Sequence, residues 1–72
     1  MVRYAICINN EGYLASLEAR KVYQVLPDPD AEAHGYLRVI DESEEDYLFA
    51  ADRFVPIEVP EEVQMLFAVE AA

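Results

Sequence analysis

Residues 36–49, YLRVIDESEEDYLF, carry the clearest β-hairpin pattern in the chain. Residues 36–40 combine aromatic and β-branched side chains, which favour strands. Residues 41–46 are all polar and predict a turn, after which residues 47–49 return to aromatic and apolar side chains. Two strand-like segments joined by a polar turn predict a hairpin and a mainly β fold.

Three further segments have the character of strands. Residues 2–8 alternate with period two, and residues 21–26 and 54–59 are rich in valine, isoleucine and aromatic residues. Pro56 cannot donate a ladder hydrogen bond, so the last of these strands is expected at a sheet edge. Residues 50–53 predict one 3₁₀ turn as a connector. In residues 2–8, the alternation places the side chains of Val2, Tyr4, Ile6 and Ile8 on one face of the strand.

The segments between these strands are less uniform. Residues 14–20 combine good helix formers with apolar residues at helical spacing, and the sequence leaves a short helix and an irregular loop both open. Residues 27–30, PDPD, predict a loop, because proline fixes φ and keeps its predecessor out of the helical region. Residues 31–34 predict one helical turn that ends at Gly35.

A C-terminal helix is predicted to begin at Pro60. Proline suits the first helical position, and Glu61 and Glu62 complement the positive end of the helix dipole. Apolar residues follow at helical spacing and cover more than one stripe. They are Val63, Met65, Leu66, Phe67 and Val69.

Several segments resemble a known group of small β proteins. The run LEARKVYQV, residues 17–25, resembles the start of SH3-like bacterial and phage mini-domains, in which a leucine precedes a Lys-X-Tyr-X-Val strand. Residues 37–42, 46–49 and 53–57 look like their central hairpin, short turn and closing strand. With the run CINNEG at residues 7–12 and FVPI at residues 54–57, the chain also resembles a group of short uncharacterised bacterial proteins, over roughly residues 4–60.

This resemblance implies a small SH3-like five-stranded barrel over residues 1–59, with residues 60–72 as a short helix packed on it, in a single domain. It brings no activity, because fold alone does not specify function. The aromatic Ala-Leu-Tyr-Asp-Tyr motif and the tryptophan of peptide-binding SH3 domains are missing from this sequence.

The chain is strongly acidic. Its 72 residues include 15 acidic and 5 basic side chains, which gives a net charge of −10. Binding to nucleic acid depends on Lys and Arg that replace condensed counterions, so we expect neither nucleic acid nor an anionic membrane as a partner. The sequence has no signal-peptide pattern and no apolar run of about 20 residues, so the expected location is the cytoplasm.

No cofactor or metal site is predicted. The acidic segment 41–46 lacks the glycine and the distal glutamate of a calcium loop, and we interpret it as a solvated hairpin tip. The two glycines, Gly12 and Gly35, cannot form a phosphate-binding loop. The single cysteine, Cys7, allows neither an internal disulfide nor metal-ligand spacing.

The preferred function is a non-catalytic protein-binding or adaptor module, because tyrosines and exposed apolar residues are common at interfaces. An acidic mimic or inhibitor of a basic, nucleic-acid-binding protein is an alternative, motivated by the density of carboxylates. A small enzyme is the least supported alternative and would depend on Cys7 and His34.

The expected binding residues fall in two places, the central hairpin and the C-terminal helix. The partner is either another protein or a second copy of the chain. The candidate residues are Tyr36, Tyr47, Glu44, Glu45, Met65 and Val69.

Overall fold

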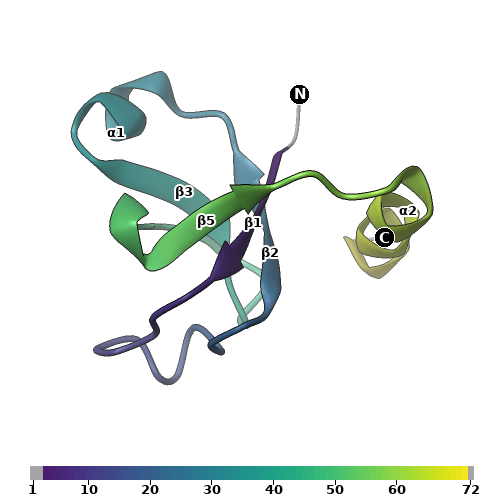
Figure 1. Ribbon diagram of the computed structural model, residues 1–72, viewed down its shortest axis with the longest axis horizontal. Coiled ribbons are helices and arrows are strands. Elements are labelled where there is room, and N and C mark those ends of the chain that lie inside the picture. The colour runs from purple at the N-terminus through teal and green to yellow at the C-terminus, as the bar shows by residue number, and fades with distance from the viewer. Residues whose placement is uncertain (1–2, 72) are drawn as a thin grey trace.

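The computed structural model describes residues 3–71, with the surroundings of side chains described through residue 67. Five strands, two α-helices and one 3₁₀ turn follow one another along the chain (Figure 1). They are β1 (Arg3–Cys7), β2 (Val22–Leu26), α1 (Pro29–Ala33), β3 (Tyr36–Ile40), β4 (Asp46–Ala50), η1 (Ala51–Arg53), β5 (Phe54–Ile57) and α2 (Glu61–Ala71).

All five strands belong to one antiparallel sheet in the order β4-β3-β2-β1-β5. The predicted mainly β fold, its five strand segments and its C-terminal helix are confirmed. The sheet is not closed into a barrel, because β4 and β5 are its two edges within residues 3–71. Their side chains still meet across the curled sheet, where the ring centroids of Phe49 and Phe54 lie 6.2 Å apart.

The hydrophobic core lies on the concave face of the sheet. In β1 it takes the small side chains of Ala5 and Cys7, because large aromatic rings from β2, β4 and β5 fill the space opposite them. Ile6, on the other face, is half-buried, and Ile8 is exposed. The buried core cluster comprises Ala5, Cys7, Leu17, Tyr23, Val25, Val39, Phe49 and Phe54.

The long connection between β1 and β2 covers this core. Leu17 is 0% exposed, and the ring of Tyr13 packs edge-on against Phe49 at 5.1 Å. Residues 14–16 and 19–20 form turns and the segment contains no α-helix, which settles its ambiguity in favour of a loop. One helical turn is closed by the bond from Leu17 N to Tyr13 O at 2.9 Å, and the chain then leaves the helical region, since Arg20 has φ of 68°.

Helix α1 begins two residues earlier than the sequence predicts. Asp28 is its N-cap and accepts a hydrogen bond from the amide of Ala31 at 3.1 Å, while Pro29 occupies the first turn. The proline that predicted a loop is therefore the start of the helix. The same carboxylate accepts from Nε of Arg38 at 2.8 Å, which ties α1 to β3. Both bonds hold the pKa of Asp28 below its usual value, the backbone bond more strongly.

Helix α2 stands to one side of the sheet (Figure 1). It contacts the sheet through Phe67, whose ring centroid lies 5.0 Å from that of Tyr4. Met65 and Leu66 are exposed. No helix in the described part of the chain is long and apolar enough to span a bilayer.

Replacing Leu17 by Ala tests whether the loop is part of the core. We expect the free energy of unfolding to fall by about 2–5 kcal/mol, because the substitution leaves a cavity against the sheet. Leu14 is the matched control, since it lies in the same loop but is 77% exposed. Leu14→Ala should change the stability by less than about 0.5 kcal/mol. Urea unfolding measures both, and equal effects of the two substitutions would refute the role of Leu17.

Candidate interaction surface

The outer face of the sheet, opposite the core, carries a cluster of apolar side chains, with the polar Gln24 of β2 beside it opposite Tyr4. Cross-strand pairing places Tyr4 opposite Ile57, and Ile6 opposite both Val22 and Val55. Residues directly opposite each other in a ladder share a face, so these side chains form one patch. A sheet with one solvated face normally alternates apolar and polar residues, and β1 does not. The outer face is defined here by Tyr4, Ile6, Val22, Ile40, Val55 and Ile57.

Helix α2 carries further apolar side chains beside this patch. At about 100° per residue, Val63 lies close to Phe67 on the helix, whereas Met65 lies about 200° from Phe67 and faces away from the sheet. Phe67 packs on Tyr4, while Met65 and Leu66 are 61% and 62% exposed and Val63 is 37% exposed. Large apolar side chains exposed next to one another mark interaction sites in soluble proteins. The outer face together with Val63, Met65, Leu66 and Phe67 is called the interaction surface below.

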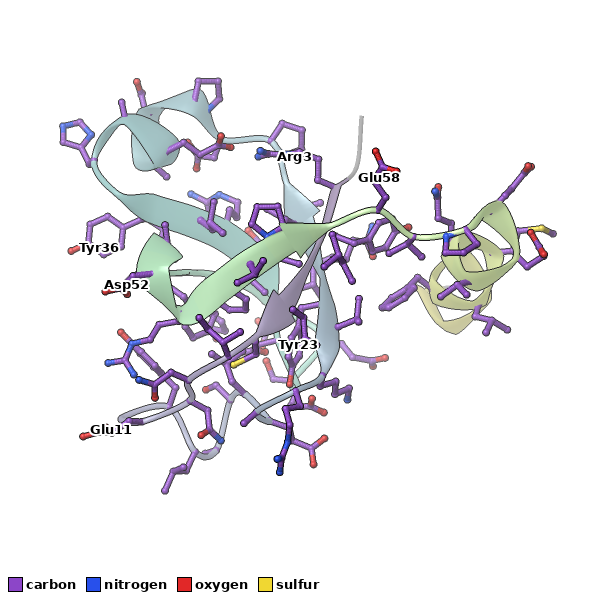
Figure 2. All side chains as sticks on the ribbon, in the orientation of Figure 1. Arg3, Glu11, Tyr23, Tyr36, Asp52 and Glu58 are labelled. Atoms are coloured by element: carbon purple, nitrogen blue, oxygen red, sulfur yellow. The ribbon has the colours of Figure 1, made fainter. Side chains whose placement is uncertain are left out.

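Two hollows of about 460 Å³ each are formed next to α2. The first is bounded by β2, by the end of β3, by the hairpin tip and by Phe67. The second is bounded by Tyr4, by the end of β5 and by the segment that leads from Glu58 to α2 (Figure 2). The ring of Phe67 lines the first hollow and contacts Tyr4, which lines the second.

The hairpin tip is only partly free to bind a partner. Residues 41–46 contain five carboxylates, and three of them have partners inside the chain. Asp41 is buried and accepts from the amide and the hydroxyl of Ser43 at 2.8 and 2.5 Å. Asp46 accepts from Arg38 at 3.0 Å. Among the described residues, the carboxylates of Glu44 and Glu45 have no hydrogen-bond or ion-pair partner.

Glu42 connects the tip to β2. It accepts hydrogen bonds from Nζ of Lys21 at 2.6 Å and from the hydroxyl of Tyr23. The bond from Lys21, and then that from Tyr23, lowers the pKa of Glu42, and the same carboxylate raises the pKa of Lys21. Burial, and then the bond to Glu42, raises the pKa of Tyr23. The tyrosine oxygen also accepts from the amide of Glu18 at 2.7 Å, so three segments meet at one hydroxyl.

The structure does not bring together the two tyrosines expected to form a recognition patch. Tyr47 pairs with Val39, which faces the core, whereas Tyr36 pairs with Ala50. Because successive residues of a strand alternate between faces, Tyr36 and Tyr47 lie on opposite faces of the hairpin. Both are exposed, and Figure 2 shows Tyr36 on the side of the molecule away from α2.

The other candidate residues fall in different places. Glu44 borders the first hollow, and Glu45 does not. Met65 belongs to the interaction surface. Val69 lies in α2, among the residues whose side chains are outside the described part of the structure. Val22 and Ile40 line the first hollow but were not among the predicted binding residues, although both lie in predicted strands.

The cysteine and the histidine have different surroundings. Cys7 is fully buried in the core, whereas His34 is exposed at the end of α1, where its Nδ1 lies 2.8 Å from the backbone oxygen of Asp30. No group of three or more potential metal ligands gathers within residues 3–71. A Cys7–His34 pair would therefore require the core to open.

Comparisons with protein-family models, with curated proteins and with solved structures find no match to this chain. The function is therefore inferred from the geometry of the chain itself.

Replacing Glu42 by Gln tests the link between the tip and β2. We expect the free energy of unfolding to fall by about 1 kcal/mol near neutral pH. This is the typical contribution of a hydrogen bond to a charged group, reduced because Glu42 is partly exposed. The folded-state pKa of Glu42 lies below its usual 4.5, so this stabilisation is present above that pH and is lost as the pH falls through the folded-state pKa. The difference from the wild type should therefore shrink in acid.

Urea unfolding at about pH 7 and about pH 3 measures this difference. Glu45→Gln is the matched control, because it removes a neighbouring carboxylate that has no partner among the described residues. That variant should stay within about 0.5 kcal/mol of the wild type. A deficit of Glu42→Gln that stays constant from neutral pH to acid would contradict the assignment.

Proposed function

We propose that this chain is a non-catalytic protein-binding module that engages its partner through the interaction surface. The observation that carries the proposal is the set of large apolar side chains exposed on α2 beside an apolar sheet face. Burying apolar area contributes about 25 cal/mol per Å², so covering this surface would be favourable. A partner is the simplest means of covering it.

The partner is a protein other than a second copy of this chain. Each copy carries a net charge of −10, so two copies repel each other at the distances of an interface. The interaction surface has acidic residues near it, including Glu44, Glu58 and Glu61, which would meet their own counterparts in a symmetric dimer. A partner with positive charge avoids this cost.

The finer fold class, an SH3-like barrel, is part of the same proposal. It is supported by the order of elements from the β3–β4 hairpin through the short η1 turn to β5, and by the pairing of β5 with β1. The strand edges at β4 and β5 approach each other through Phe49 and Phe54, as in a barrel that is left partly open. We place the protein in the cytoplasm, where a lone thiol such as Cys7 stays reduced.

The two alternatives have less support. An acidic mimic needs free carboxylates, and three of the five at the hairpin tip are engaged by Lys21, Arg38 and Ser43. An enzyme based on Cys7 and His34 needs a thiol that substrate can reach, and Cys7 is 0% exposed.

The interaction surface is tested with the double variant Met65→Asp, Leu66→Asp on immobilised full-length protein. We expect proteins retained reproducibly from the native cytosol by the wild type to be lost by this variant, because charge in an apolar interface must be desolvated. The matched control is Leu14→Asp, which introduces charge at an exposed leucine of the 8–21 loop. Quantitative mass spectrometry of the retained proteins provides the measurement.

If Leu14→Asp removes the same proteins as the double variant, or if the wild type retains none, the proposed function is wrong. Circular dichroism of each variant checks that the secondary structure is unchanged. Light scattering of the wild type distinguishes a monomer, which we expect, from a homo-oligomer.

A further inference from the structure

We infer that the first hollow, between α2, β2 and the hairpin tip, binds a peptide segment of the partner that places an apolar side chain next to a Lys or Arg. This inference rests on the proposed function and names the chemistry of the partner at one place on the interaction surface. It follows from the combination of an apolar floor with an acidic rim.

The floor of the hollow is mainly apolar, although Gln24 of β2 also lines it. Val22 and Ile40 contribute from neighbouring strands of the outer face, and Phe67 contributes from α2. The volume of about 460 Å³ lies within the range of roughly 300–1,000 Å³ that is typical of ligand pockets. A leucine, isoleucine or phenylalanine side chain inserted between Phe67 and the sheet would be removed from water on both sides.

The rim of the hollow is negative. The carboxylates of Asp41, Glu42 and Glu44 border it, against the single ammonium group of Lys21. That ammonium group is already paired with Glu42 at 2.6 Å and with Glu18 at 3.6 Å, so its charge is compensated within the chain. Glu44 is exposed and has no ion-pair partner among the described residues. A cation of the partner can therefore pair with Glu44 without displacing an existing contact.

The rim is also held in place before binding. Asp41 fixes the turn through Ser43, and Glu42 is tied to β2 through Tyr23. The amide of Glu42 donates to the backbone oxygen of Ser16 at 3.0 Å, which anchors the tip to the 8–21 loop between β1 and β2. A rim that is already ordered loses little conformational entropy when a ligand binds, and preorganisation of this kind favours affinity.

The charge selects the class of occupant. Phosphate groups of nucleic acid or lipid would be repelled by the net negative charge of the rim, which Lys21 offsets only in part, and so would the acidic surface of a second copy. An apolar segment without positive charge would fill the floor but would leave Glu44 unpaired. The geometry thus favours a cationic and apolar segment over each of these occupants.

A library of random twelve-residue peptides displayed on phage tests the inference on the full chain. We expect the selected peptides to be enriched in Lys or Arg next to Leu, Ile or Phe. Their affinity, measured by fluorescence polarisation with labelled synthetic peptides, should fall by about tenfold or more for Glu44→Lys, because like charges then face each other. It should also weaken as the salt concentration rises.

Two matched controls separate the hollow from the general charge of the chain. Glu45→Lys makes the same charge change one residue away and outside the hollow, and it should alter the affinity by less than about twofold. Phe67→Ala should weaken binding more than Leu66→Ala, because Phe67 lines the hollow and Leu66 does not.

The inference is overturned if no peptide is selected, if the selected peptides show no basic enrichment, or if the two charge variants weaken binding equally. Its failure is distinguishable from failure of the proposed function. Partner capture that depends on Met65 and Leu66 but not on Glu44 would leave the function standing and remove this assignment. If partner capture depends neither on Met65 and Leu66 nor on Glu44, both the proposed function and this assignment are wrong.

Discussion

The seating of the 8–21 loop on the concave face holds this small domain together. Five strands of four or five residues form an open sheet that cannot enclose a core alone, and Leu17 with Tyr13 supplies the second layer that a sheet requires. The loop is then bonded to β2 through the hydroxyl of Tyr23 and to the hairpin tip through the amide of Glu42. The packing that completes the core therefore also sets the position of the acidic rim.

Three of the five basic residues serve this internal order. Arg3 pairs with Glu32 of α1, Lys21 with Glu42 of the tip, and Arg38 with carboxylates on both of its sides. Each such pair contributes little to stability where it is exposed. Together they place positive charge between elements of the chain and leave negative charge at its surface. The surface that remains for a partner is accordingly apolar and anionic. This combination specifies the chemistry of the partner more closely than the net charge of −10 does alone.

The strands and α2 were predictable from the sequence because periodicity and proline act locally. The loop at residues 14–20 was not, since its conformation depends on the burial of Leu17 against residues distant in sequence. The separation of Tyr36 from Tyr47 depends on register. The tip closes with Ile40 opposite Asp46, which places Val39 opposite Tyr47 and turns the two tyrosines to different faces. Of the candidate binding residues, Glu44 borders the first hollow and Met65 is exposed on α2, because exposure at a turn and on a helix follows from local pattern.

Helix α2 links stability to binding. An isolated helix of eleven residues is marginal in water, and this one is held to the sheet chiefly by the contact of Phe67 with Tyr4. Among the side chains that the structure describes on this helix, Val63, Met65 and Leu66 stay exposed. A partner that contacts both the exposed side of α2 and the outer face would bury Leu66 and hold Phe67 against the sheet. A partner that binds only the docked helix stabilises that state by RT ln(1 + [L]/Kd), where [L] is the concentration of the free partner, so binding of the partner and docking of α2 would be thermodynamically coupled.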